Sequence, residues 1–308
     1  MSLVTTANPD QPLCSQTLSM YLMNRLPLFW ELTKPRIVSM VIVATSVGYI
    51  SGAHFSIRPL SFMMTLLGTS LFAGSASVLN QVMEKKRDAL MLRTSLRPLP
   101  TGRIDSSEAL IWGVLLFLSA SLLLVLFVNW LSFWFAFATW FLYLAVYTPL
   151  KPISSVNTIV GAVPGALPPV IGWAGATGEV GLEALSLFLI LFLWQFPHFL
   201  AIAWLYRDDY RRGGYRMITC DDLTGHKTGF MALGYSTVLI PVSVLPFQIH
   251  MAGTIYLVAS LLFSLYYWLR AVEFLRERSD QTARRLLFAS LWYLPLVYLF
   301  LILNPLPA

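Results

Sequence analysis

The most constraining feature of this chain is a series of apolar stretches, each roughly 18 to 25 residues long and able to cross about 30 Å of hydrocarbon as a helix. Hydrophobic residues make up 57% of the sequence and charged residues only 12%. Backbone polar groups find no water partner inside a bilayer, so segments that cross it are helical. The sequence predicts an all-α integral membrane protein with nine transmembrane helices, at 36–53, 60–82, 108–128, 131–148, 157–175, 182–206, 229–247, 251–272 and 285–304.

The basic residues support this count independently. Of the 21 Lys and Arg, every one except Arg58 lies around the start of the first stretch or around a connection that follows an even-numbered stretch. The positive-inside rule places these connections, and the N-terminus, in the cytoplasm. The positive charges are spread over short connections, so the net charge of +6 reflects topology and no nucleic-acid partner is expected.

The rest of the sequence indicates one polytopic membrane domain, 31–308, which follows a cytoplasmic N-terminal tail, 1–30. Residues 1–26 contain a single basic residue and lack the apolar core of a signal peptide. Cys14 and Cys220 have no CxxC partner, and neither a disulfide nor a metal site is expected from them. Motifs of nucleotide-binding proteins, zinc proteases and serine hydrolases are absent from the sequence.

Two long polar connections are candidates for chemistry, because long loops in a compact fold are commonly functional. The first begins with Asn80, Glu84 and Asp88, which are four residues apart and share one helix face. Carboxylates at a membrane boundary are costly unless they hold a cation. Mg²⁺ prefers such oxygen ligands and commonly bridges them to phosphate oxygens. This motif predicts a Mg²⁺-dependent enzyme that acts on a diphosphate beside a lipid phase.

The same connection continues with Arg93 and Arg97, and Pro98 then extends the chain. Both arginines are predicted to bind diphosphate oxygens, since guanidinium groups suit phosphate geometry. The alternative is a positive-inside loop whose acids only balance its bases.

The second connection contains Asp208 and Asp209, followed by a Gly-Gly pair. Adjacent side chains point about 100° apart on a helix, so one acid is expected to face the site and the other water or an arginine. Both are candidate metal ligands, and the alternative is a salt-bridged helix end. Asp221 and Asp222, further along the connection, are expected to be solvated.

Two further basic segments lie on the same predicted side. Lys34-Pro35-Arg36 begins the first stretch, and Lys151 follows Tyr147 at the end of the fourth. Either segment could bind substrate or serve as an interfacial anchor.

His198 is unusual because it lies well inside the sixth stretch, next to Pro197 and four residues after Trp194. Its ring could contact a metal-bearing substrate, or it could hydrogen-bond the backbone carbonyl that Pro197 leaves without a donor.

Together these motifs resemble those of the UbiA-type intramembrane polyprenyltransferase superfamily over roughly residues 32–304, and more narrowly those of its haem branch, the protohaem IX farnesyltransferases. The acidic motif fits the whole superfamily, whereas the Arg-Thr, Trp-Gln-x-Pro-His-Phe and Asp-Tyr-x-x-Gly-Gly elements are more specific to the haem branch. The matching segments are Lys34-Pro-Arg-Ile37, Asn80/Glu84/Asp88, Arg93-Thr94, Arg97-Pro-Leu-Pro100, Tyr147-Thr-Pro-Leu-Lys151, residues 161–169, Gly172-Trp173, Trp194-Gln-Phe-Pro-His-Phe199, and Asp209-Tyr210 with Gly213-Gly214 and Met217.

The resemblance implies nine helices around a central cavity and transfer of a farnesyl group from farnesyl diphosphate to a vinyl group of protohaem IX, which gives haem O. It implies Mg²⁺ as cofactor, the bacterial inner membrane as location with the active-site loops on the cytoplasmic face, and haem A synthase or a terminal oxidase in assembly as candidate partners beside the lipid bilayer. The expected catalytic residues are Asn80, Glu84, Asp88, Lys151 and Asp209; the substrate-binding residues are Arg36, Arg93, Arg97, Tyr147, Trp194 and His198; the metal ligands are Glu84, Asp88, Asp208 and Asp209.

One departure from the superfamily pattern concerns the second acidic motif. Many members carry a second Asp four residues after the first, but Arg212 stands at that spacing from Asp208, which favours Asp209. Lys86 also replaces an acid that some relatives carry in the first motif, so the number of metal ions is open.

Two other functions remain open. One is prenyl transfer to a quinone or another aromatic acceptor. A haem-binding role for His198 would favour haem as the acceptor over these compounds. The other is transport of an anionic solute, which requires broken helices near the membrane midplane. Pro197 and the cluster of Pro164, Pro168 and Pro169 are compatible with such breaks, and release of diphosphate would exclude transport.

Overall fold

The computed structural model describes residues 25–54 and 56–306, and every element named within them is helical. Nine helical segments in this part of the chain are long and apolar enough to cross a membrane, which confirms the predicted fold class and count. The segments are α2 (Pro35–Gly52), α3 (Pro59–Asp88), α4 (Ser106–Phe127), α5 with η1 and α6 (Trp130–Leu150), α7 with α8 (Asn157–Thr177), α9 (Leu182–Leu205), α12 (His226–Gln248), α13 (Thr254–Glu277) and α14 (Asp280–Leu303).

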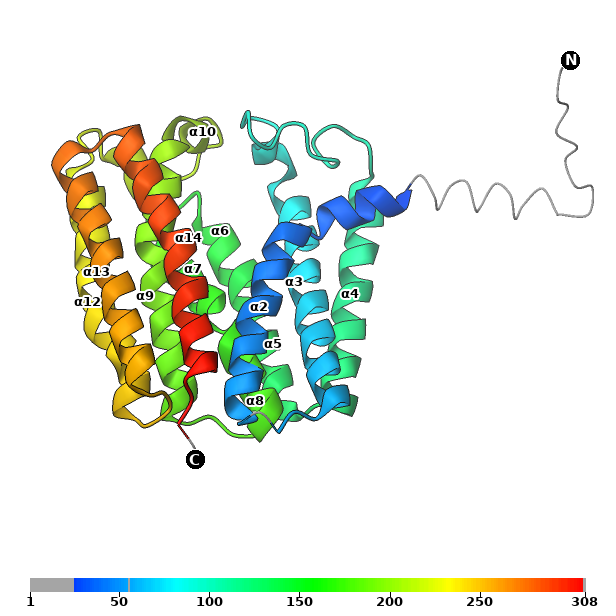
Figure 1. The fold of residues 1–308 in the computed structure, drawn as a ribbon. Coiled ribbons are helices and arrows are strands. Elements are labelled where there is room, and N and C mark those ends of the chain that lie inside the picture. The colour runs from blue at the N-terminus through cyan, green and yellow to red at the C-terminus, as the bar shows by residue number, and fades with distance from the viewer. Residues whose placement is uncertain (1–24, 55, 307–308) are drawn as a thin grey trace, which may run out of the picture.

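The helices form two neighbouring groups (Figure 1). Helices α2, α3, α4 and α5 make one group, and α9, α12, α13 and α14 make the other. Helices α7 (Asn157–Ala166) and α8 (Pro168–Thr177) lie between them, because they contact η1 and α2 on one side and α9 on the other. The largest apolar core belongs to the second group and extends onto α8 and α2.

The contact between α2 and α8 depends on two glycines. A Cβ at Gly48 would lie 1.9 Å from Pro169 O, and one at Gly172 would lie 1.9 Å from Thr45 O. Only the absence of a side chain lets the two backbones approach this closely, as at many helix contacts within membranes. The two helices therefore pack backbone to backbone where the first group meets α8.

Two of the membrane segments are irregular. The fifth is divided at Leu167, where α7 ends and Pro168 starts α8. The fourth contains a π-helix, η1 (Leu142–Tyr147), between α5 (Trp130–Phe141) and α6 (Thr148–Leu150). Such insertions are often found at functional sites, and this one is separated from Lys151 only by the three residues of α6.

Both polar connections lie at the same end of the bundle, the upper end in Figure 1. Helix α3 continues to Asp88, six residues beyond the apolar stretch predicted to end at 82, because the charged residues that end that stretch do not end the helix. The second connection contains α10 (Arg207–Arg212) and α11 (Ile218–Asp221). The bundle thus brings the two acidic motifs to one membrane face, as predicted.

The predicted tail, 1–30, lies mostly outside the described residues. Its described part belongs to a helical segment, 25–32. Leu32 belongs to a core cluster that includes Leu99 and Ile104, and Leu28 and Phe29 pack against this cluster. The packed part of the chain thus begins before residue 31, and the domain boundary stays a prediction.

Candidate active site

The first acidic motif points into the protein from the last turns of α3. Asn80, Glu84 and Asp88 are all buried, with at most 7% of each residue exposed. Each carboxylate has a cationic partner from another segment. Lys151 Nζ lies 2.9 Å from Glu84 Oε1, and Arg97 Nη1 lies 2.8 Å from Asp88 Oδ2. Buried carboxylates need such partners, because an unpaired buried charge is strongly destabilising.

Asn80 is oriented by hydrogen bonds with two other helices. Its Nδ2 donates to Thr148 Oγ1 at 3.0 Å, and that hydroxyl donates to Tyr143 O at 2.8 Å. The amide oxygen is therefore directed to the other side, where Lys34 Nζ donates to it at 3.4 Å. An amide oxygen with this orientation can accept from a cation or contact a metal ion.

Lys34 is the basic residue of its segment that points into the site, whereas the sequence analysis predicted Arg36 as the substrate-binding residue. It lies at the start of α2 with φ 53°, in the left-handed region that is strained for a side chain before proline. This turn directs Lys34 toward Asn80, whereas Arg36, the predicted substrate-binding residue, is exposed. Burial, together with the nearby charges of Arg97 and Lys151, lowers the pKa of Lys34 to about 7.

Lys151 lies in an aromatic enclosure. Its ammonium is 4.6 Å from the ring centroid of Tyr147 and 5.6 Å from that of Tyr215. Burial acts to lower the pKa of Lys151, but Tyr147 and Glu84 outweigh it and the pKa lies well above its ordinary value. Lys151 is therefore a permanent positive charge beside the acidic motif. Tyr215, whose buried hydroxyl has no hydrogen-bond partner among the described residues, was not predicted.

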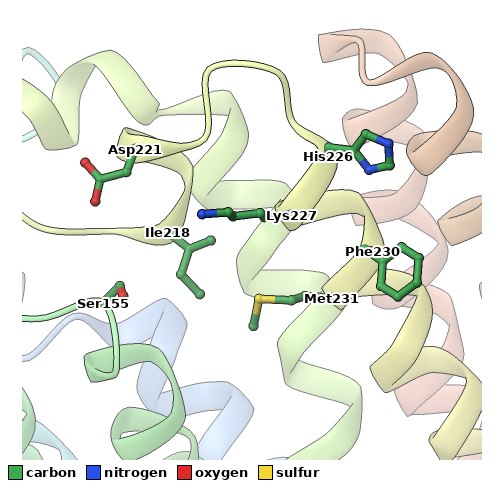
Figure 2. Close-up of a pocket in the computed structure, with 7 residues that line it drawn as sticks. All are labelled: Ser155, Ile218, Asp221, His226, Lys227, Phe230 and Met231. Atoms are coloured by element: carbon green, nitrogen blue, oxygen red, sulfur yellow. The ribbon is translucent and has the colours of Figure 1, made fainter.

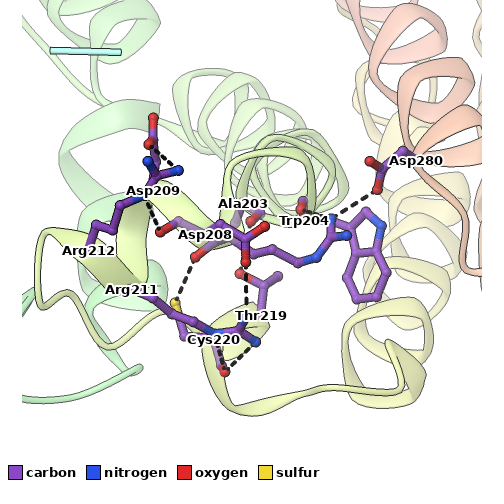
Figure 3. A network of polar contacts seen from close by, with 10 residues as sticks. Ala203, Trp204, Asp208, Asp209, Arg211, Arg212, Thr219, Cys220 and Asp280 are labelled. Atoms are coloured by element: carbon purple, nitrogen blue, oxygen red, sulfur yellow. Dashed lines mark hydrogen bonds and ion pairs between the residues drawn. The ribbon is translucent and has the colours of Figure 1, made fainter. Parts of the chain in front are cut away.

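The two adjacent acids of the second motif differ sharply, as Figure 3 shows. The side chain of Asp208 is 68% exposed and pairs with Arg211 at 3.0 Å, whereas that of Asp209 is 10% exposed. Asp209 accepts hydrogen bonds from the backbone N–H groups of Leu92 and Arg93, each at 3.2 Å. The side chain that faces inward is thus Asp209, and it joins the second connection to the first.

The arrangement of the four predicted metal ligands, Glu84, Asp88, Asp208 and Asp209, can be compared with these contacts. The described residues contain no group of three or more His, Cys, Asp or Glu side chains close enough to hold a metal ion. Asp208 is paired at the surface, and Asp209 is bound to backbone amides and to Arg212 at 3.2 Å. The four predicted ligands do not form one such group among the described residues, and their role as metal ligands stays a prediction.

Glu84 and Asp88 still fit a magnesium ion that is shared with a diphosphate. Mg²⁺ is commonly held by one or two carboxylates while substrate phosphates and water supply the other ligands. These two carboxylates lie one helical turn apart on one face of α3 and are both directed inward. The donor set suits such a shared ion and does not suit a closed protein cage.

Arg93 and Arg97 also differ. Arg97 reaches Asp88, but the guanidinium of Arg93 lies over the rings of Tyr206 and Tyr210, at 5.1 and 5.8 Å from their centroids. Only Arg97 of this pair contacts the first acidic motif, and Arg93 instead packs the first connection onto the second. Arg87 contributes in the same way, because its Nη1 donates to Gly213 O at 3.0 Å.

Deeper in the bundle, α9 presents His198 and Trp194. Their rings are stacked with centroids 4.8 Å apart, and His198 Nδ1 lies 2.7 Å from Ser290 Oγ of α14. The hydrogen bond of the ring is thus to Ser290, not to the carbonyl freed by Pro197. His198 is seven residues before the end of α9, roughly 10 Å along the axis, so it lies below the acidic end.

A separate cavity of about 530 Å³ lies between α11, the start of α12 and the connection before α7 (Figure 2). It contains none of the predicted site residues. Its lining residues are Ser155, Ile218, Asp221, His226, Lys227, Phe230 and Met231. Nearby, Asp222 is buried and accepts from Thr228 N at 2.8 Å, so the prediction that it is solvated was wrong.

Comparison with known proteins assigns the chain to a class. The model of the UbiA prenyltransferase family matches residues 41–294, and the chain belongs to this family of membrane prenyltransferases. Its curated relatives carry a more specific name, protohaem IX farnesyltransferase. The protein of that name from Salinibacter ruber is 42% identical, with 89% of this chain and 99% of the relative aligned. The one from Solibacter usitatus is 41% identical, with 89% and 97% aligned.

Solved structures share the fold at low sequence identity. A structure of digeranylgeranylglyceryl phosphate synthase matches 91% of this chain and 98% of its own, with a TM-score of 0.77 and 18% identity. A UbiA homologue from Archaeoglobus fulgidus, bound to GPP and Mg²⁺, matches 89% of this chain and 99% of its own, with a TM-score of 0.61 and 15% identity. These likenesses support the nine-helix prenyltransferase fold.

Proposed function

We propose that this protein transfers a farnesyl group from farnesyl diphosphate to a vinyl group of protohaem IX and so forms haem O. The observation that carries the proposal is the convergence of Lys34, Arg97 and Lys151 on the acidic motif at one end of the bundle. Two cations, Arg97 and Lys151, and the Lys34 amine, which is cationic when protonated, suit a diphosphate with a bound divalent ion. The name shared by the relatives supports farnesyl and protohaem as the two reactants.

The cationic side chains would bind the diphosphate and stabilise its charge. Lys151 and Arg97 lie 2.9 and 2.8 Å from carboxylate oxygens of the motif, so the same groups can contact phosphate oxygens bound there. A magnesium ion held by Glu84 and Asp88 would neutralise charge that develops on the leaving diphosphate. Burial of the site strengthens each of these interactions, because the surrounding medium has a low dielectric constant.

The reaction requires no side-chain nucleophile. The bond between the allylic carbon and the diphosphate oxygen breaks, and its electron pair leaves with the diphosphate. The vinyl π electrons of the acceptor form the new carbon–carbon bond. Water then adds its oxygen to the other vinyl carbon and loses a proton, which gives a hydroxyethylfarnesyl group. Apolar and aromatic walls would delay capture of the allylic carbon by water.

The acceptor is proposed to lie beside Trp194 and His198. Their stacked rings offer a flat surface for a macrocycle, and the His198 ring offers a nitrogen for its iron. A quinone-type acceptor needs no such nitrogen, so His198 favours haem. The divided fifth segment is of the kind that transporters use. Membership of a prenyltransferase family nevertheless favours prenyl transfer over transport.

The protein is a multi-pass membrane protein. We propose the bacterial inner membrane as its location, with both polar connections in the cytoplasm, because the basic residues gather on that side. Haem A synthase or a terminal oxidase in assembly are the proposed partners, since they would consume haem O. Farnesyl diphosphate would then enter the site from the cytoplasmic face.

Haems extracted from cells with and without the protein test this function. Mass spectrometry should detect haem O only when the protein is present, and Asp88→Asn should abolish it. Asp208→Asn is the matched control, because Asp208 is an exposed acid paired with Arg211. Haem O formation by Asp88→Asn at the wild-type level would contradict the metal-binding role, and unchanged haems with a modified quinone would favour the other acceptor.

A further inference from the structure

The hydrogen bonds around Ser290 carry information about the proton on His198. Ser290 is fully buried in α14, and its Oγ lies 2.7 Å from His198 Nδ1 and 2.5 Å from Leu287 O. Trp194 Nε1 donates to Ser290 O at 2.8 Å. Helix α9 is therefore joined to this one residue of α14 by two side chains that lie one turn apart.

The single hydroxyl proton of Ser290 can serve only one neighbour; the Tyr267 hydroxyl also lies beside Ser290, but it donates its own proton to Trp194 O at 3.1 Å. Leu287 O has no proton to give, so the contact at 2.5 Å requires Ser290 Oγ to be the donor. The oxygen is then left as an acceptor toward His198, and Nδ1 must carry a proton. If the hydroxyl instead donated to Nδ1, two oxygen lone pairs would face each other at the shorter distance. The network therefore favours the Nδ1–H form of the ring.

A neutral imidazole with its proton on Nδ1 has an unshared electron pair on Nε2. No hydrogen bond to Nε2 is found among the described residues, and the ring is only half-buried. Hydrogen bonds to the far nitrogen commonly fix the tautomer and orientation of a metal-binding histidine. Such a network would present Nε2 as an electron-pair donor to a ligand beside α9.

We infer that Ser290 is a positioning residue that holds His198 as the Nδ1–H tautomer, so that Nε2 can bind the iron of the macrocyclic acceptor. The identity of that ligand rests on the proposed function, whereas the tautomer rests on the hydrogen bonds alone. Trp194 contacts both residues of this pair, because its ring stacks on His198 and its Nε1 donates to the backbone oxygen of Ser290.

Histidine-selective ¹⁵N NMR of the purified protein tests the tautomer without haem. The described chain contains three other histidines, His54, His226 and His250, and the spectrum of His198→Ala assigns the signal of interest. The wild type should show a neutral ring protonated at Nδ1, and Ser290→Ala should move the proton to Nε2. Ser264→Ala is the control, because it removes another buried serine hydroxyl, one that lies 3.5 Å from Tyr293 Oη.

Titration of the same proteins with protohaem and with metal-free protoporphyrin IX tests the consequence. Ser290→Ala should weaken protohaem binding about ten- to a hundredfold, as loss of such a supporting hydrogen bond commonly does. Binding of the metal-free macrocycle, and the KM for farnesyl diphosphate, should not change. Ser264→Ala should match the wild type in every measurement.

Four outcomes would overturn this inference in whole or in part. A wild-type ring protonated at Nε2 would exclude the tautomer, and an unchanged protohaem affinity in Ser290→Ala would exclude the positioning role. An equal loss for both macrocycles would show that the change only disturbs packing. If the wild type bound no protohaem at all, the proposed function and the iron-binding role would both be contradicted, and the NMR result would still decide the tautomer.

Discussion

Lys151 Nζ and Glu84 Oε1 lie 2.9 Å apart, and the two side chains are only 14% and 8% exposed. The pair joins the end of the fourth membrane segment to the acidic motif of α3, across 67 residues of sequence. It places a cation beside the proposed metal site before any substrate binds. The charge is buried and preorganised, so it needs little rearrangement when a diphosphate arrives.

The coupling between these two residues can be measured with a double-mutant cycle. Lys151→Met alone should lower the free energy of unfolding by on the order of 3 kcal/mol, because it leaves Glu84 buried without its cation. Lys151→Met with Glu84→Gln should lower it by less than the sum of the single changes. The measurement is thermal unfolding in detergent, and additive effects would show that the ion pair does not contribute to stability.

Lys34 and Arg36 should respond differently to loss of charge. Lys34→Met should raise the KM for farnesyl diphosphate about tenfold or more, because a hydrogen bond to a charged group is worth about 1.5–3 kcal/mol. Arg36→Met should leave it near the wild-type value, since the Arg36 side chain is exposed. Steady-state kinetics with varied farnesyl diphosphate make the comparison. A larger increase in KM for Arg36→Met than for Lys34→Met would show that Arg36, not Lys34, binds the diphosphate.

The difference between these two residues shows what the sequence could not supply. The segment Lys34-Pro35-Arg36 was recognised, but the left-handed backbone at Lys34, which decides which cation turns inward, has no signature in the sequence. Likewise, the sequence indicates that the side chains of Asp208 and Asp209 diverge and favours Asp209 for the site, and the contacts of α10 show directly that Asp209 is the inner one. Ser290 is 92 residues from His198, so no local pattern relates them.

The fold was far more predictable than the site. Nine apolar stretches of membrane length, with basic residues at alternate connections, fix the helix number because a bilayer leaves few other options. The spacing of Asn80, Glu84 and Asp88 correctly placed three side chains on one inward face. Partners from other segments, such as Thr148 and Tyr215, depend on tertiary packing and were not predicted individually.

Asp222 should make stability depend on pH. Burial acts to raise the pKa of this carboxyl, but hydrogen bonds from Thr228 and Thr224 outweigh it and lower the pKa below its ordinary value. A lowered pKa adds stability at pH values above the unfolded-state pKa of about 4, and this stability is lost as the pH falls through the folded-state value. Asp222→Asn should therefore cost roughly 1 kcal/mol at pH 7 and progressively less near pH 3. Thermal unfolding across this range tests the trend, and a cost that grows with acidity would contradict it.

The orientation in the membrane is testable by cysteine labelling. Probes near Arg97, Arg212 and Glu277 should react only from the cytoplasm, and a probe near Glu179 only from outside. The first three positions belong to connections at the end of the bundle that carries both acidic motifs. Glu179 follows the last residue of α8, Thr177, at the other end of the bundle. Labelling near Arg212 from outside would reverse the proposed topology and move the site to the other face.

Reconstitution with defined substrates tests the central claim most directly. Purified protein should convert protohaem and farnesyl diphosphate to haem O in the presence of Mg²⁺, with one diphosphate released for each haem O formed. Chromatography with mass detection follows the haem, and a phosphate assay after pyrophosphatase treatment follows the leaving group. Equal yields of the two products, both lost on addition of a chelator, are the predicted result. Diphosphate release without haem O would contradict the proposed acceptor. Haem O formation at an unchanged rate in the presence of the chelator would contradict the proposed metal site.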